Sequence, residues 1–236
     1  MPAPTTPLVP ITVASIYNNA ALPTRMAKCT PDTAAGILGL ADDLRSLGHQ
    51  LRLSDLFRSY DMQRQAYLDY VEGRKKAYSP PPGGSMHEAG RAMDIDLSAI
   101  GIPLSQFWEI ARARGFSPII DSPVSTRSEA WHFDRRGSHD AVYKYVQQGN
   151  AGSSIPPYTQ MAHSAILAIG VHVDSLPDQS VGYLQSALIR LGFDPGRIDG
   201  IMGERTLGAM RNAGVDPDDP AGSLTLRLKE KFPLEF

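Results

Sequence analysis

The chain has 236 residues, of which 42% are hydrophobic, and a formal net charge of −2. This length allows one large domain or two modest ones, and the near-neutral charge gives no electrostatic case for a nucleic-acid or anionic-membrane partner. No run of about 18 or more apolar residues is present, so we expect no membrane span. The single cysteine, Cys29, cannot form an internal disulfide and is expected to be a small buried apolar residue.

Before residue 80, the sequence predicts a helix, a strand and a second helix in turn. The sequence predicts no role for the residues before about Thr30. The two alternatives are that they pack across the neighbouring domain or that they remain loose. A helix is predicted over residues 33–48, where apolar residues recur at helical spacing. Residues 51–57 are predicted as a strand that delivers Arg58, and Asp61 is expected to cap a helix that ends near Val71.

Two polar runs carry the chemistry. The run SMHEAGRAMD, Ser85 to Asp94, follows a Pro- and Gly-rich loop that either borders a cleft or is a plain connector. In it, Gly90 allows a turn after His87, and the alternation after Arg91 predicts a strand that projects Asp94 into a polar pocket. A buried carboxylate needs a partner, and a metal ion is a natural one.

The second run, EAWH, spans Glu129 to His132. Glu129 and His132 are three positions apart, so in a straight strand their side chains would point to opposite faces. We therefore expect the backbone to bend, with Glu129 on a loop and His132 on a strand. Trp131 is expected beside the metal as part of a dry wall. Two imidazoles and one carboxylate suit Zn²⁺ with one position left open, and the remaining glutamate can act as the general base in amide hydrolysis.

The elements after the zinc motif favour an α+β fold. We predict helices over residues 103–113 and 140–147 and a short strand over 117–120, with a polar loop at 121–128 that shapes substrate access. The fold class expected is therefore α+β, with a small, mainly antiparallel sheet and flanking helices. A Gly-, Ser- and Pro-rich segment then predicts a linker.

At these residues the chain resembles the zinc D-alanyl-D-alanine carboxypeptidase family, which includes vancomycin-resistance D,D-peptidases and many phage endolysins. Its pattern, S-x-H-x-x-G-x-A-x-D followed by E-x-W-H, is met at every fixed position. The family also carries a Tyr-Arg-Ser element followed by Gln; here Phe57 replaces the tyrosine, before Arg58 and Gln63.

The resemblance implies one Zn²⁺ per chain, with His87, Asp94 and His132 as its ligands and Glu129 as catalytic base. It implies that Arg58 binds the substrate carbonyl or carboxylate, for which its fork of donors is suited; the alternative for Arg58 is a structural ion pair. The residues expected at the substrate are Arg58, Ser85, Gln63 and Trp131, although Ser85 could instead orient its loop.

Two further acids are candidates for the layer behind the ligands. A histidine that binds a metal usually donates its other N–H to a carboxylate or a carbonyl. Asp96 and Asp134 fit this role better than a ligand role. The alternative for both, a solvated surface acid, stays open.

The C-terminal part resembles the peptidoglycan-binding module, a small three-helix domain. The matching residues are Leu184, Gln185, Leu188, Leu191, Gly192, Phe193, Gly196, Ile198, Asp199, Gly200, Gly203 and Thr206. The sequence departs from the family after Met210, so the module either targets the wall or has become a structural cap. A short amphipathic helix is expected over residues 224–232.

These resemblances predict a zinc peptidase domain over residues 1–148, a linker over 149–158 and a peptidoglycan-binding-like helical domain over 159–236. The expected function is zinc-dependent D-alanyl-D-alanine carboxypeptidase activity on bacterial peptidoglycan or its stem peptides. The alternatives are an endolysin-type L-alanyl-D-glutamate endopeptidase and a non-catalytic, zinc-containing wall-binding protein. The oligomeric state is left open.

The expected place of action is the bacterial cell wall. The apolar stretch in the first 20 residues has no Lys or Arg before it and is interrupted by prolines, which makes it a poor secretory signal. The sequence therefore suggests a protein made in the cytoplasm and released as phage lysins are, or one whose leader is missing.

Overall fold

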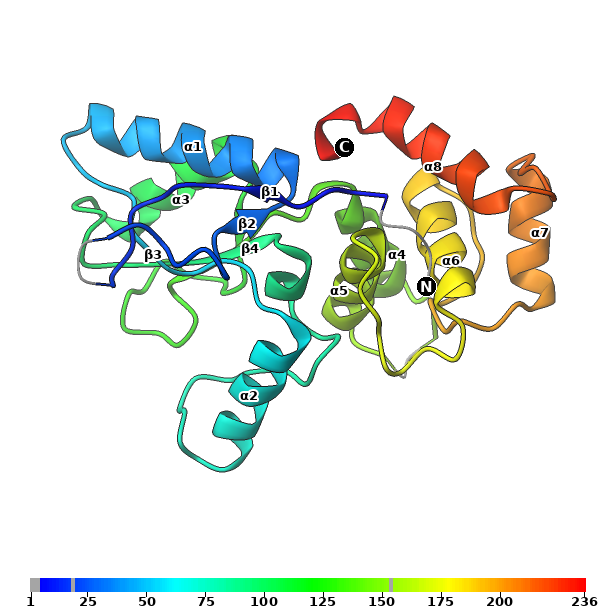
Figure 1. The fold of residues 1–236 in the computed structure, drawn as a ribbon, viewed down its shortest axis with the longest axis horizontal. Helices are drawn as coiled ribbons and strands as arrows, with labels where there is room; N and C mark the ends of the chain where they lie inside the picture. Colours follow the sequence, from blue (N-terminus) through cyan, green and yellow to red (C-terminus); the bar gives the residue numbers. More distant parts are fainter. Residues whose placement is uncertain (1–4, 18–19, 153–154) are drawn as a thin grey trace. The chain divides into compact units, whose positions relative to one another are not determined.

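The computed structural model describes residues 5–17, 20–152 and 155–236, and it divides into two compact units (Figure 1). One unit, called the sheet unit, comprises residues 8–79 and 86–136; the other, called the helical unit, comprises residues 80–85, 137–236 and the chain up to Pro7. The fold class is α+β, as predicted: small antiparallel sheets with flanking helices, and an all-helical C-terminal region. None of the helices in the described ranges is long and apolar enough to cross a membrane.

The sheet unit is built on four short strands in the order β3-β4-β6-β5, each antiparallel to its neighbour. They are β3 (Leu53–Asp55), β4 (Ala92–Ile95), β6 (His132–Asp134) and β5 (Ser117–Pro118). The central strands β4 and β6 are buried along their whole length. The strands predicted at 51–57 and 117–120 are confirmed in place but are shorter, because the sheet pairs only where the central strands reach.

Two helices complete the core of this unit. They are α1 (Pro31–Ser46) and α3 (Leu104–Ala113), which contact each other and place their apolar residues in one cluster with the sheet. Both helices were predicted to within about two residues. Cys29 is buried in the same cluster, and burial raises the pKa of its thiol to about 12, so it behaves as the inert apolar residue expected.

In the segment before Thr30, for which the sequence predicted no role, residues 8–17 and 20–29 pack across the sheet unit. Strands β1 (Val9–Pro10) and β2 (Lys28–Cys29) form a two-stranded antiparallel sheet. Apolar side chains between them, among them Ile11 and Leu22, belong to the buried core. This part was missed because its strands are two residues long and show no periodicity.

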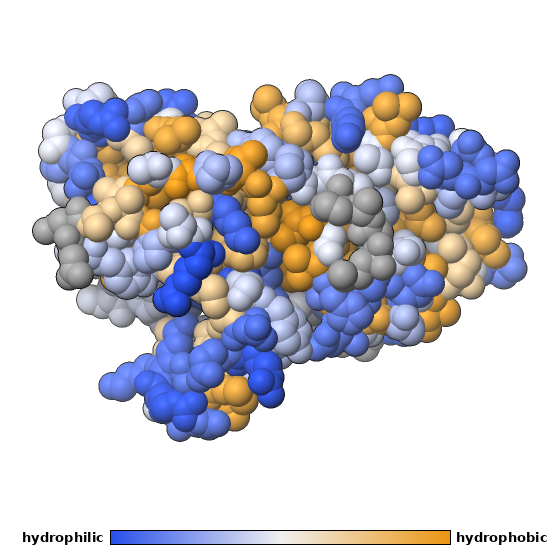
Figure 2. All heavy atoms as spheres, viewed as in Figure 1, coloured by the Kyte–Doolittle hydropathy of each residue, from blue (hydrophilic) through white to orange (hydrophobic). Residues whose placement is uncertain are grey.

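Helix α2 (Tyr60–Val71) projects away from the sheet (Figure 1). Its N-cap is Ser59, whose hydroxyl accepts a hydrogen bond from the amide of Met62, so the prediction that Asp61 caps this helix was wrong by two residues. Figure 2 shows mostly hydrophilic residues on this arm, with one apolar patch. Tyr70, Val71 and Tyr78 are its exposed large apolar residues.

The helical unit contains α4 (Asp140–Gln147), α5 (Pro157–Ala168), α6 (Gln179–Leu191), α7 (Glu204–Asn212) and α8 (Pro220–Lys231). Helix α4 was predicted with these bounds, whereas α5 was not predicted. Helix α8 replaces the shorter helix expected over 224–232. Helix α6 ends at Gly192, as predicted, with φ of 99° in the left-handed region that favours glycine.

A buried ion pair holds the C-terminal end of the helical unit. Glu235 accepts hydrogen bonds from the amide and hydroxyl of Ser138, at 2.6 and 2.7 Å. Arg190 on α6 donates to the same carboxylate at 2.8 Å and to the Ser138 hydroxyl at 2.8 Å. This cluster ties the two ends of residues 137–236 together.

The linker predicted over residues 149–158 lies within the helical unit, and its residues 153–154 lie outside the described ranges. Helix α4, on the near side of the linker, contacts α5 and α6 on the far side. The domain boundary at 149–158 stays a prediction.

Candidate metal centre

The pairing of β4 with β6 brings two of the predicted ligands together. Asp94 and His132 are partners in the antiparallel register, so both side chains leave the sheet on the same face. His87 comes from the 3-10 helix η1 (Met86–Ala89), directly before β4. Gly90 joins the two with φ of 62°, and a Cβ there would lie 2.9 Å from the Cα of Cys29, so glycine is required by both conformation and space.

One donor atom from each of His87, Asp94 and His132 lies within 4.8 Å of the other two, and all three side chains are buried. The Asp94 carboxylate oxygen Oδ1 is 3.3 Å from Nε2 of His87 and 2.9 Å from Nδ1 of His132. The two imidazole rings meet edge to face, with centroids 5.0 Å apart. The fold therefore brings the three residues predicted as ligands to one point.

The hydrogen bonds of His87 fix its proton. Its Nδ1 lies 2.7 Å from the carbonyl oxygen of Leu56, which can only accept, so Nδ1 carries the hydrogen. In the neutral ring, Nε2 then presents a lone pair to the Asp94 oxygen. Two acceptors facing each other need a cation between them, and a metal ion fits this donor set.

His132 has a carboxylate behind it. Its Nε2 lies 2.9 Å from Asp134, and its Nδ1 faces Asp94. Burial alone lowers the pKa of His132, but Asp134 and Asp94 outweigh it and raise this pKa to about 10. Burial likewise raises the pKa of Asp94, and the two histidines more than reverse this, which keeps Asp94 ionised. Asp134 thus occupies the place proposed for an acid behind a ligand.

Arg58 is locked against the centre. Its Nη2 donates to Asp94 at 3.3 Å, and its Nη1 donates to Gln63 at 3.2 Å. Its Nε donates to Asp55 at 2.5 Å. A guanidinium has five N–H donors, so these contacts leave two for a substrate oxygen. Arg58 therefore makes the structural ion pairs that were its alternative role and retains donors for the predicted one.

Glu129 stands on the predicted bend. Its carbonyl accepts a hydrogen bond from the amide of His132 at 3.0 Å, which closes a turn. Among the described residues Glu129 is the only non-glycine with a positive φ, 67°, a conformation that costs about 1 kcal/mol or more and is concentrated at functional sites. Its Oε1 is buried and has no hydrogen-bond partner among the described residues. Burial raises the pKa of Glu129, which makes the carboxylate a stronger base.

The structure does not bring every predicted residue to the centre. Asp96 accepts hydrogen bonds from the amide and hydroxyl of Ser98 and pairs with Arg52, so it serves a turn rather than a histidine. Trp131 is half-buried against the apolar core. Ser85 is buried and belongs to the 80–85 segment of the helical unit.

A buried charge network that was not predicted from the sequence lies beneath the motif. Arg91 donates two hydrogen bonds to Asp32, at 3.0 and 2.7 Å, and Arg135 donates a third at 3.1 Å. Asp32 and Arg91 are both almost fully buried. Arg91 stands between His87 and Asp94 in sequence, so this network anchors the metal motif to the first turn of α1. The one feature of the sequence that could have indicated this network is Arg91 itself, a basic residue inside a motif that predicts a metal site.

The C-terminal motif residues build a loop. The two N–H groups on Nε2 of Gln185, on α6, are shared among Asp199, the carbonyl of Ile201 and the hydroxyl of Thr206, at 2.9, 3.1 and 3.2 Å. Its carbonyl oxygen accepts from the amides of Asp199 and Gly200, both at 3.0 Å. These contacts explain why the motif contains a glutamine and an aspartate without reference to a ligand.

Comparison with known proteins found one family model that matches part of the chain. Residues 27–114 match the family model VanY, described as D-alanyl-D-alanine carboxypeptidase. That range contains Arg58, His87 and Asp94, while Glu129 and His132 follow it. A search of curated proteins found no match. The family match supports a peptidoglycan carboxypeptidase.

Two solved structures are also similar to the chain. One is described as the LdcB LD-carboxypeptidase, in a study of peptidoglycan recognition; it is 21% identical over 56% of this chain and 69% of its own, with a TM-score of 0.44. The other is an L,D-carboxypeptidase, DacB, from Streptococcus pneumonia; it is 20% identical over 55% of this chain and 84% of its own, with a TM-score of 0.35.

Proposed function

We propose that the chain is a zinc-dependent D-alanyl-D-alanine carboxypeptidase of peptidoglycan stem peptides. The observation that carries the proposal is the convergence of His87, Asp94 and His132, with Glu129 on a strained turn three residues before the last of them. Three protein ligands leave a tetrahedral zinc ion one position for catalysis. Zinc held there supplies the Lewis-acid chemistry that polarises a carbonyl and activates water near neutral pH.

The chain's own residues divide the remaining work. Glu129 takes the proton of the attacking water and later passes it to the leaving amine, for which its raised pKa is suited. Arg58 directs its two remaining N–H donors at the substrate carboxylate or at the oxygen that gains charge. Asp134 fixes the orientation of the His132 ring, and the Leu56 carbonyl fixes that of His87.

The decisive experiment is mass spectrometry of purified muropeptides after incubation with the protein, with and without a zinc chelator. Zinc-dependent loss of the terminal D-alanine from pentapeptides is the expected result. Cleavage between L-alanine and D-glutamate would replace the proposal with the endopeptidase activity. Muropeptides that stay intact in both arms, with zinc bound, would favour the non-catalytic role.

Variants separate metal binding from catalysis. Glu129→Gln is expected to keep one zinc ion per chain by elemental analysis and to lose about 10²- to 10⁴-fold in turnover. The matched control is Glu109→Gln, which changes an exposed glutamate on α3 and should leave turnover unchanged. His87→Ala is expected to lose the zinc itself. Normal turnover by Glu129→Gln would remove Glu129 from the role of base.

The C-terminal helices are proposed to bind the cell wall. The resemblance of residues 181–210 to the peptidoglycan-binding module supports this, and so does the separate apolar cluster that α6, α7 and α8 share. Co-sedimentation of the full chain with insoluble peptidoglycan tests it, with the zinc-free protein as an arm in which the peptidase site is inactive. Failure to sediment would assign these helices a structural role.

A further inference from the structure

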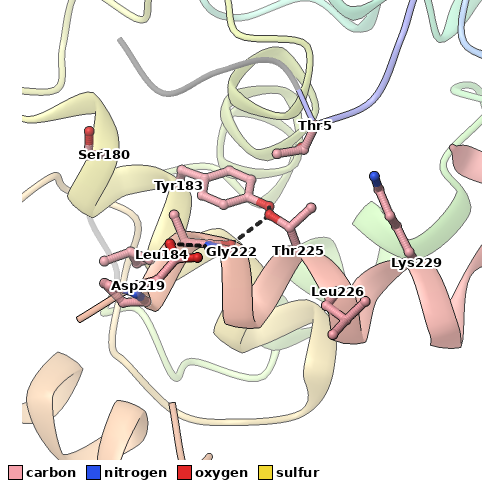
Figure 3. Close-up of a pocket in the computed structure, with 11 residues that line it drawn as sticks. Thr5, Ser180, Tyr183, Leu184, Asp219, Gly222, Thr225, Leu226 and Lys229 are labelled. Carbon is pink, nitrogen blue, oxygen red and sulfur yellow. Dashed lines mark hydrogen bonds between the residues drawn. The ribbon is translucent and has the colours of Figure 1, made fainter. Parts of the chain in front are cut away.

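A hollow of about 600 Å³ lies on the helical unit, between α6 and one face of α8 (Figure 3). This volume is within the range of sites that take small molecules and short peptides. The wall formed by α8 is one helix face, since its residues recur at steps of three and four; they are Gly222, Thr225, Leu226 and Lys229. We call this hollow the α6–α8 cleft.

One end of the α6–α8 cleft presents hydrogen-bond acceptors. Thr225 donates its only hydroxyl proton to the carbonyl of Ala221 at 2.7 Å, so in its 2.8 Å contact with Tyr183 the tyrosine must be the donor. Both hydroxyl oxygens therefore keep acceptor capacity. Asp219 adds a carboxylate, of which Oδ1 caps α8 by accepting from the amide of Gly222 at 3.0 Å. Such an end favours an ammonium or amide N–H group of a ligand.

The other end presents a cation. Lys229 is exposed, and its ammonium lies 5.6 Å from the ring centroid of Phe236. Figure 3 shows its side chain on the same side of α8 as the Thr225 hydroxyl. Between the two ends the cleft is mainly apolar, with Leu184 on one wall and Leu226, which is 60% exposed, on the other. A carboxylate is the natural partner for this end.

The spacing of the two ends sets the length of the ligand. Asp219 and Lys229 are ten positions apart on one helix, which corresponds to about 15 Å at 1.5 Å per residue. An extended peptide covers about 3.3–3.6 Å per residue, so about four residues span this distance. The aliphatic stems of the intervening side chains can cover the apolar middle of the cleft while their charged ends stay in water.

We propose that the α6–α8 cleft binds a peptide of about four residues, with its N–H donor end at Asp219 and its terminal carboxylate at Lys229. That this peptide is a free stem peptide of the cell wall rests on the function proposed above. The cleft is then a second peptide site on the chain, formed entirely by residues of the helical unit.

The test is an NMR titration of the zinc-free, full-length protein with the tetrapeptide L-Ala-γ-D-Glu-L-Lys-D-Ala and with its C-terminal carboxamide. Chelation removes hydrolysis, so binding is read separately from the peptidase activity. We expect amide shifts confined to α6 and α8, from Asp219 to Lys229, and weaker binding of the carboxamide. Lys229→Met should lower affinity for the carboxylate form about three- to fivefold and leave affinity for the carboxamide unchanged.

Matched variants keep the test specific. Lys76→Met, at an exposed lysine of the sheet unit, should change neither affinity. Asp219→Asn retains a good N-cap for α8 while removing the charge, and should weaken binding of the free-amine peptide more than of its N-acetylated form. The inference fails if the shifts lie outside the cleft, if Lys229→Met binds both forms as the wild type does, or if only glycan fragments bind there. Zinc-dependent hydrolysis is assayed separately. If the protein hydrolyses muropeptides but the peptide causes no amide shifts at the cleft, this inference fails while the proposed function stands.

Discussion

Replacement of Asp32 tests the charge network beneath the metal motif. Burial raises the pKa of Asp32, but Arg91 and Arg135 outweigh it and lower this pKa below its ordinary value. Asp32→Ala leaves the buried Arg91 guanidinium without its carboxylate. Removing one partner of a buried ion pair costs about 3–5 kcal/mol, because the remaining charge stays out of water. Asp32→Asn keeps one acceptor oxygen, and we expect it to cost about 2 kcal/mol.

The free energy of unfolding is measured in urea at pH 7, with Asp43→Ala as control. Asp43 makes two hydrogen bonds to Arg114, both at 2.6 Å, but at the surface, so its loss should leave the unfolding midpoint close to that of the wild type. A depressed carboxyl pKa stabilises the fold above the ordinary pKa of aspartate, near 3.9, and this contribution disappears as the pH falls through the folded value. If Asp32→Ala unfolded like Asp43→Ala, the network would be a solvated surface pair and the reasoning would be wrong.

Two further changes test the helical unit. Burial lowers the pKa of His163 to about 4, so the unfolded chain binds this proton first as the pH falls from about 6.5. We expect stability to be full above about pH 6.5 and to fall by up to about 3 kcal/mol towards pH 4; His163→Gln should flatten this slope in urea titrations, and an unchanged slope would assign it to other groups. Gln185→Leu removes acceptors from two backbone amides and should cost about 2–4 kcal/mol. A thermal midpoint equal to that of the wild type would show that the loop does not depend on Gln185.

The sequence predicted that His87, Asp94 and His132 would come together because their spacing has few geometric solutions. His87 and Asp94 are seven residues apart around an obligatory glycine, and the odd step from Glu129 to His132 required the bend that φ of 67° at Glu129 confirms. Of the two acids predicted to lie behind the histidines, only one contacts a histidine in the structure. Asp134 reaches His132, whereas Asp96, on an equally plausible strand position, turns to Ser98 because β4 ends at Ile95.

Other features depended on pairing across long stretches of chain. Asp32 lies 59 residues from Arg91, and no local sequence pattern in either segment indicates that the two residues are in contact. Helix α5 is buried along almost its whole length, so it lacks the alternation of apolar and polar faces that reveals a surface helix. Strands β1 and β2 are held by the core that they cover rather than by their own residues.

The Glu235 cluster constrains the order in which the protein can be made. Ser138 and Glu235 are separated by 97 residues, so the helical unit cannot close until nearly all of its chain has emerged from the ribosome. Until then Arg190, whose side chain is fully buried in the finished fold, lacks its carboxylate. A nascent chain that lacks Glu235 would therefore present an incompletely packed helical unit to cellular proteases.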